Sequence, residues 1–244
     1  MHMRERPDAV RIRALIYDFD DTIVESERIN DTLFCDLLRR EYSLTLGPEE
    51  LEGLYGLSWT RIFSWLAESR GIRDRDGIWR RFMEIKREYL RERSLRTARG
   101  IERMLSLPAA QAIVTGSTRE EVAMMLANTR IRPDLFDLVL CDEDCEKGKP
   151  DPVGFLLALE RLDIEAGEAL VFEDSGAGIE AARRAGIPVA FVRELASRDC
   201  ARLTDLRFDD FEEAYPWVSR RIARPPSLDS GGRAAMMTED KETR

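Results

Sequence analysis

A short apolar run that ends in three acids constrains the fold of this chain more than any other feature. Residues 14–17 are too few for a helix and read as a strand buried on both faces, as in a parallel sheet. Asp18, Asp20 and Asp21 follow within four positions. Because open α/β sheets bind ligands at the carboxyl ends of their strands, the run predicts a site at that edge of a sheet.

The same acids predict a cation. Carboxylates this close repel one another, so an ionised cluster requires a positive partner. Carboxylate oxygens with no histidine nearby suit Mg²⁺ best. The alternative is an acidic turn, because aspartate is common in turns and the spacing of Asp18 and Asp20 is weak evidence alone.

Composition narrows the classes of function. The chain has 244 residues, a formal charge of -9 and a pI near 5.0, which argue against general attraction to nucleic acid or an anionic membrane. No apolar run approaches the roughly 18 residues of a membrane span. Residues 1–8 lack the apolar core of a signal peptide. We therefore expect a cytoplasmic monomer or homodimer with no nucleic acid or membrane partner.

Histidine and cysteine content limits the available chemistry. The one histidine, His2, lies in a polar terminus, which excludes Ser-His-Asp and Cys-His mechanisms. Acid-base work then falls to carboxylates, lysine, tyrosine or cysteine. Four cysteines make no disulfide framework in a chain this large, so we expect reduced thiols at positions 35, 141, 145 and 200. A zinc pair at Cys141 and Cys145 is the alternative to loop thiols.

A long stretch after the first strand carries only helical periodicity. Apolar residues recur at helical spacing through four successive segments between residues 25 and 96. So many helices exceed an ordinary crossover of about a dozen residues. The pattern predicts a helical domain, 25–96, inserted between core segments 1–24 and 97–222. The proline- and glycine-containing residues 223–244 are expected to form a disordered tail.

Beyond the insert, short apolar runs alternate with helical segments. The strand candidates are residues 111–114, 138–140, 169–172 and 188–192, the last of which closes the series. Ser117 with Glu120 predicts a capping box, and Asp151 with Pro152 predicts the start of another helix. A last helix is expected in 209–222. The alternation indicates an α/β fold with a doubly wound, Rossmann-like parallel sheet.

The strand ends carry groups suited to one chemistry. Asp18 follows the first strand, Thr115 follows the second beside a helix N-terminus that favours an anion, and Glu173 and Asp174 follow a later one. Lys149 supplies a cation. Carboxylates for Mg²⁺ together with threonine and lysine for phosphate oxygens predict a phosphoryl-transfer site.

In four ordered motifs the chain resembles the haloacid dehalogenase superfamily of aspartate-nucleophile hydrolases, and within it the phosphoglycolate phosphatase and β-phosphoglucomutase group. The motifs are Asp18-Phe19-Asp20-Asp21-Thr22, Ile113-Val114-Thr115-Gly116-Ser117, Lys149-Pro150-Asp151-Pro152 and Phe172-Glu173-Asp174-Ser175-Gly176-Ala177-Gly178. The resemblance covers roughly residues 13–192, and the helical insert looks like the family's cap domain. Asp21 departs from the usual glycine, and we expect it to alter the loop without removing a reacting group.

The resemblance implies a Mg²⁺-dependent reaction through an aspartyl-phosphate. Asp18 would attack phosphorus. Asp20 would protonate the leaving alcohol and later take a proton from water. Mg²⁺ would be held by Asp18, the backbone carbonyl of Asp20 and Asp174, with Glu173 close by or acting through water.

The resemblance also suggests the residues that contact the substrate. Thr115, Gly116 and Lys149 would bind the phosphoryl oxygens, and Lys149 would also restrain Asp18. In the cap, Trp59 falls where related caps often face the substrate, although a place in the cap core is the simpler interpretation. Arg61 is a weaker candidate, because a surface charge is the default for it, as it is for Lys86.

These features favour a phosphatase acting on a small phosphorylated metabolite, such as a sugar phosphate or phosphoglycolate. A β-phosphoglucomutase-like mutase is the first alternative, but such mutases carry a histidine in the first cap helix, where this chain has Asn30. A phosphonatase would need a cap lysine, and Lys86 is the candidate. A regulatory protein that keeps the fold without catalysis is a fourth hypothesis.

Overall fold

The fold is built on a sheet of six parallel strands. The computed structural model describes residues 11–54, 57 and 59–222, so the predicted tail lies outside the described residues. The strand order is β3-β2-β1-β4-β5-β6, and every neighbouring pair is parallel. The strands are β1 (Ala14–Tyr17), β2 (Ala110–Val114), β3 (Leu138–Leu140), β4 (Ala169–Glu173), β5 (Val189–Val192) and β6 (Leu206–Phe208).

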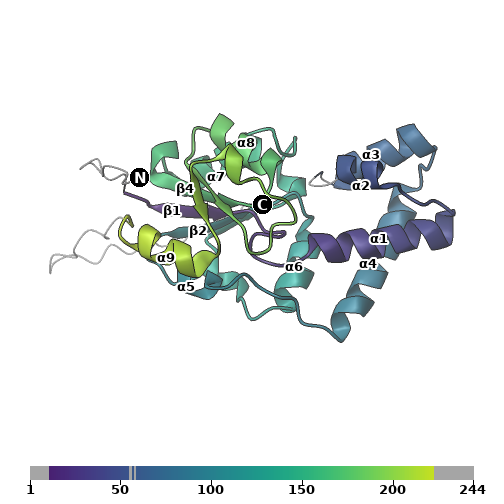
Figure 1. Cartoon of the computed structure of the whole chain (residues 1–244), viewed down its shortest axis with the longest axis horizontal. Coiled ribbons are helices and arrows are strands. Elements are labelled where there is room, and N and C mark those ends of the chain that lie inside the picture. Colours follow the sequence, from purple (N-terminus) through teal and green to yellow (C-terminus); the bar gives the residue numbers. More distant parts are fainter. Residues whose placement is uncertain (1–10, 55–56, 58, 223–244) are drawn as a thin grey trace, which may run out of the picture.

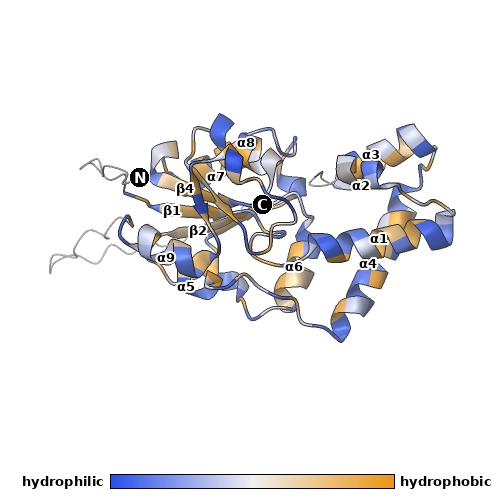
Figure 2. Ribbon diagram, viewed as in Figure 1, coloured by the Kyte–Doolittle hydropathy of each residue, from blue (hydrophilic) through white to orange (hydrophobic). Residues whose placement is uncertain are grey.

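Helices cover both faces of this sheet (Figure 1). On one face, Leu15 and Tyr17 pack with α5 (Ile101–Leu105), α6 (Arg119–Ala127) and α9 (Phe211–Ser219). On the other, Ala14 and Ile16 pack with α7 (Val153–Leu162) and α8 (Gly176–Arg184). Successive side chains of a strand point to opposite faces, so each strand contributes to both clusters. The central strands are therefore mostly apolar, as Figure 2 shows, with Gln111 of β2 and Glu173 of β4 as buried polar exceptions. The predicted doubly wound fold is confirmed.

Four helices form the cap domain between β1 and β2. They are α1 (Glu27–Tyr42), α2 (Pro48–Leu54), α3 (Trp59–Arg70) and α4 (Arg75–Arg91). They pack around their own apolar cluster, which includes Phe34, Leu66 and Phe82. In Figure 1 the cap lies beside the end of the sheet where β1 delivers its acids. The predicted helical insert is therefore present as a separate layer of helices.

Two linkers lie side by side where the chain enters and leaves the cap. The backbone N–H of Glu25 donates to the carbonyl of Arg96 at 3.0 Å, and Val24 forms an antiparallel bridge with Thr97. We propose that the cap spans residues 25–96, because this paired crossing is where the two connections meet.

Three local predictions are wrong. The series of strands does not close at 192, because β6 follows at the sheet edge; it has only three residues, too few for a periodic signal. Helix α6 is capped by Thr118 with Glu121, one residue later than predicted. At α7 the cap residue is Pro152, and Asp151 instead accepts a bond from the Val153 N–H at 3.1 Å.

A buried ion pair joins the cap to the core. The Lys86 Nζ of α4 lies 2.9 Å from Glu121 Oε1 of α6, and the two side chains are 1% and 0% exposed. The expectation of a surface charge at Lys86 is therefore wrong. The spacing of the sequence could have predicted the burial of Lys86. It lies in a series with Ile78, Phe82 and Leu90, four residues apart, on the buried face of α4.

Among the described residues the longest helix is α4, with 17 residues. No helix there combines the length and the apolar character needed to cross a bilayer.

Candidate active site

The register of the sheet brings the acidic strand ends together. Tyr17 at the end of β1 pairs with Ile113 of β2 and with Phe172 of β4. The residues that follow Tyr17 and Phe172 must therefore be neighbours, and the Asp18 N–H donates to the Phe172 carbonyl at 3.0 Å. The prediction that these strand ends converge on one edge is borne out in the geometry.

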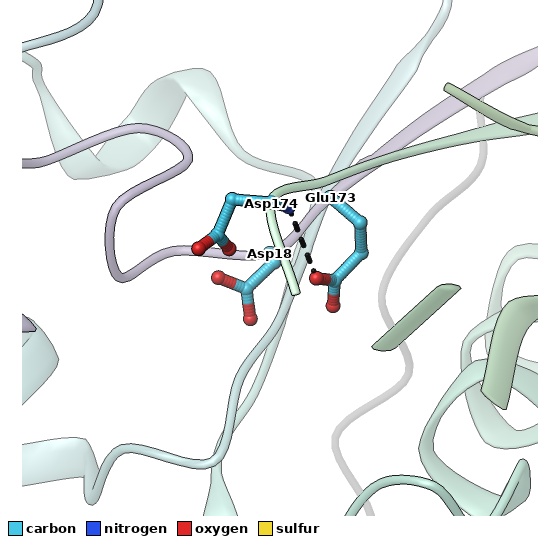
Figure 3. A group of neighbouring side chains, drawn as sticks. All are labelled: Asp18, Glu173 and Asp174. Atoms are coloured by element: carbon cyan, nitrogen blue, oxygen red, sulfur yellow. Dashed lines mark hydrogen bonds between the residues drawn. The ribbon is translucent and has the colours of Figure 1, made fainter. Parts of the chain in front are cut away.

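Asp18, Glu173 and Asp174 form a buried cluster of carboxylates (Figure 3). One carboxylate oxygen from each lies within 4.8 Å of the others. The Lys149 Nζ donates to Asp18 Oδ1 and to Glu173 Oε1, each at 2.5 Å. A single ammonium thus bridges two of three carboxylates, which leaves the cluster short of positive charge.

The charge balance of this cluster fits a divalent cation. Burial, together with neighbouring carboxylates, raises the pKa of Asp18 and of Asp174 well above the usual range, although Lys149 opposes the shift at Asp18. Burial alone would lower the pKa of Lys149, but Asp18 and Glu173 outweigh it and raise that pKa. A cation among hard carboxylate oxygens would keep them ionised, and the oxygen-only donor set suits Mg²⁺.

Glu173 is already occupied by protein donors. Its Oε2 accepts hydrogen bonds from the Asp174 N–H, the Ser175 N–H and the Ser175 hydroxyl at 3.2, 3.1 and 2.9 Å. A Cβ at Gly178 would lie only 1.7 Å from Glu173 Oε1, so glycine is required there for this carboxylate to fold inward. Asp18 and Asp174 are therefore better placed than Glu173 to contact a metal ion directly. Glu173 is better suited to contact the ion through a water molecule.

Asp20 lies outside the carboxylate cluster and is held by three hydroxyls. Ser26 Oγ donates to its Oδ1 at 2.5 Å, and Ser117 Oγ and Thr115 Oγ1 donate to its Oδ2 at 2.6 and 3.2 Å. The side chain is therefore fixed beside Asp18 as a group separate from the metal candidates. Sequence reasoning missed Ser26 altogether and gave Ser117 only a capping role.

Removing one of these hydroxyls should weaken catalysis. We expect Ser117→Ala to lower kcat by about 10-fold, because the proton transfer that the resemblance implies for Asp20 requires a carboxylate held in place. The measurement is phosphate release under saturating substrate. Ser106→Ala, which removes an exposed hydroxyl far from the cluster, should keep the parent kcat; an unchanged rate in Ser117→Ala would show that the bond to Asp20 is not needed.

Asp21 ties the first motif to the start of the cap. Its φ is +53°, in the left-handed region that favours glycine. Its Oδ1 accepts from the N–H groups of Ser26 and Glu27 at 3.0 and 3.2 Å, and its Oδ2 accepts from the Ser197 hydroxyl at 2.6 Å. The side chain thus satisfies backbone donors at the start of α1, where a glycine would leave them to water.

This geometry predicts an order among substitutions of Asp21. Asp21→Ala loses the acceptor and keeps a Cβ in the left-handed region, so it should be less stable than Asp21→Gly by about 1 kcal/mol. Urea denaturation of both variants measures the difference. Equal stabilities, or a less stable glycine variant, would contradict the assigned backbone strain.

A pocket opens between this cluster and the cap. Its lining includes the core residues Asp18, Thr115, Gly116 and Lys149, with Trp59 of the cap. Trp59 is also part of the cap's aromatic cluster, and the centroid of its ring lies 4.7 Å from the centroid of the Phe82 ring. Trp59 therefore belongs to the cap core and also borders the pocket, and its contact with a substrate stays a prediction.

Two other cap predictions meet different outcomes. Arg61 is exposed and lines a separate surface cleft with Arg75 and Lys147, so the structure does not bring it to Asp18. Asn30, which the resemblance matches to the cap histidine of mutases, does line the pocket. All four cysteines are free thiols, as expected, and the metal group found among the described residues contains none of them.

Together the parallel sheet, the inserted cap and the buried carboxylates define a capped α/β enzyme. A family model described as haloacid dehalogenase-like hydrolase matches residues 15–192. The chain belongs to this family, which confirms the resemblance seen in the four motifs.

Similar proteins agree with this assignment. Validoxylamine A 7'-phosphate phosphatase of Streptomyces hygroscopicus subsp. limoneus is 49% identical over 53 residues, which are 22% of this chain and 25% of that protein. Fructose-1-phosphate phosphatase YqaB of Escherichia coli is 29% identical over 188 residues, or 76% and 98% of the two chains. CbbY of Rhodobacter sphaeroides, solved with phosphate, superposes with a TM-score of 0.72 at 22% identity, covering 83% and 96%.

Proposed function

We propose that this protein is a Mg²⁺-dependent phosphatase that hydrolyses a small phosphorylated metabolite through an aspartyl-phosphate on Asp18. The observation that carries the proposal is the bridge from Lys149 to Asp18 and Glu173 inside a buried carboxylate cluster. The relatives named above for phosphatase activity support the same class of substrate.

The first half-reaction forms a bond to Asp18. A carboxylate oxygen of Asp18 attacks phosphorus as the bond to the leaving alcohol breaks, and Asp20 gives its proton to that alcohol. Lys149 holds Asp18 in place and offers its ammonium to a phosphoryl oxygen. Thr115 and Gly116 line the same side of the pocket and complete the phosphoryl site.

The second half-reaction releases phosphate. Asp20, now a carboxylate, takes a proton from water as the water oxygen attacks phosphorus and the acyl-phosphate bond breaks. When bound, Mg²⁺ would screen the charge between carboxylate and phosphate. Asp18 and Asp174 would hold it with the backbone carbonyl of Asp20, and Glu173 would act through water.

Two cap residues favour this function over its alternatives. Asn30, which has no acid-base function, stands where a mutase would use histidine. Lys86, the phosphonatase candidate, is buried against Glu121 and does not line the pocket. We further propose a cytoplasmic enzyme whose substrate is a free metabolite, without a nucleic acid or membrane partner.

Hydrolysis of p-nitrophenyl phosphate tests the proposal. We expect release with Mg²⁺ and none with excess chelator. Mg²⁺ should also raise the thermal unfolding temperature, because it binds the folded state, and Asp174→Asn should remove that shift. A rate unaffected by the chelator, or an equal shift in Asp174→Asn, would contradict the proposed metal ligands.

A further inference from the structure

The cap side of the pocket presents acidic and amide groups from the first turns of α1. Glu27, Asn30 and Asp31 lie three and four residues apart on one face of the helix, and all three line the pocket. The remainder of the cap lining is apolar and includes Phe34, Leu46, Leu54 and Trp59.

The pocket has an excess of negative charge. Five carboxylates line it, and among the described lining residues Lys149 is the one cation. A bound Mg²⁺ and a doubly charged phosphoryl group bring opposite and equal charges, so the excess remains when both are present. Lys149 is engaged with Asp18 and Glu173. A second anion on the leaving group would therefore face repulsion.

Asn30 gives an independent sign that a ligand binds here. Its side chain is 6% exposed, and its Oδ1 is buried without a hydrogen-bond partner among the described residues. Buried polar atoms are normally paired, because an unpaired one costs free energy. Asn30 is among the residues that line the pocket, so a ligand that displaces its close neighbours could supply the missing bond.

The charges around Glu27 come from several elements. Burial and the carboxylates of Asp20, Asp21, Asp31 and Asp18 raise the pKa of Glu27, so a cation placed beside it is favoured. Arg198, which is not among the lining residues of the pocket, lowers the pKa of Asp31. The larger effect of burial still raises that pKa above its usual value. The largest charge effects on Glu27 all come from carboxylates, whereas Asp31 also faces a guanidinium.

We propose that the substrate is the monophosphate ester of an amine-bearing polyol, whose ammonium binds Glu27 and Asp31 and whose hydroxyl groups reach Asn30. This inference rests on the proposed phosphatase function and defines its leaving group. The apolar cap lining accommodates the carbon skeleton. Leaving groups with a carboxylate or a second phosphate, including that of phosphoglycolate, are excluded by the same charges.

Three matched hexose derivatives test this specificity. Glucosamine 6-phosphate, glucose 6-phosphate and 6-phosphogluconate are 6-phosphates of six-carbon polyols that carry an amine, a neutral hydroxyl and a carboxylate, and the first two share the same pyranose ring. We expect kcat/KM to fall in that order, by about 10-fold at each step. Glu27→Gln should reduce the ratio of amine to neutral substrate to below about 3. Asp36→Asn, on the outer face of α1, should leave the ratio unchanged.

The outcomes separate the two proposals. The inference would be overturned if glucose 6-phosphate or 6-phosphogluconate were hydrolysed as well as glucosamine 6-phosphate or better. It would also be overturned if Glu27→Gln left the ratio of amine to neutral substrate unchanged. In either case, hydrolysis of p-nitrophenyl phosphate would still support the phosphatase function. Loss of every hydrolysis would count against the function. Calorimetric binding of glucosamine 6-phosphate and 6-phosphogluconate would then decide the inference, since it predicts tighter binding of the amine.

Discussion

Asp18→Asn will abolish phosphate release, with kcat falling by at least about 10³-fold. The amide keeps the size of the side chain but is no nucleophile, so the bond to phosphorus cannot form. It also loses the charge that holds the Lys149 ammonium at 2.5 Å. The measurement is phosphate release from p-nitrophenyl phosphate at saturating Mg²⁺.

A matched substitution controls for the loss of a carboxylate. Asp163→Asn makes the same change at the exposed end of α7, where φ is +53° and asparagine is also tolerated. This variant should keep the parent rate. An Asp18→Asn protein that released phosphate at the parent rate would remove the proposed mechanism.

Lys86→Met will lower the free energy of unfolding by about 3–5 kcal/mol. The substitution leaves Glu121 fully buried without its cation, and burial already raises the pKa of that carboxyl. Glu121 also accepts bonds from the N–H and hydroxyl of Thr118 at 3.2 and 3.3 Å, so the damage reaches the loop after β2. Urea denaturation followed by circular dichroism measures the loss.

The neighbouring ion pair is the control. Arg87 and Glu120 join the same two helices one position away, but their side chains are 49% and 50% exposed. Arg87→Met should therefore cost no more than about 1 kcal/mol. Adding Glu121→Gln to Lys86→Met removes the unpaired charge and should restore part of the stability. Similar losses for Lys86→Met and Arg87→Met would contradict the importance of burial.

The sequence was sufficient to predict most of the architecture and to propose the candidate reacting groups. Apolar runs too short for helices located the central strands, and parallel pairing requires that their carboxyl ends meet at one edge. Asp18 and Asp174 could be proposed because each follows such a strand end within an ordered motif, and Lys149 because it belongs to a third motif, in the loop before α7. Their convergence follows from the fold and needs no side-chain detail.

What the sequence did not reveal depends on packing between distant segments. Serine is common in loops and caps, so nothing local indicated that Ser26 and Ser117 would both donate to Asp20. The burial of Lys86 depends on a partner 35 positions away. Arg61 lies on α3 beside Trp59 in a region of helices, where a small error in rotation decides which side chain faces the pocket.

A crystal structure with Mg²⁺ and beryllium trifluoride, a mimic of the phosphoryl group, tests the central claim most directly. We expect beryllium bonded to an Asp18 carboxylate oxygen and Mg²⁺ in contact with Asp18 and Asp174. Lys149 and the backbone at Thr115 and Gly116 should contact the fluorides. Beryllium bound to another carboxylate, or Mg²⁺ held away from Asp174, would contradict it.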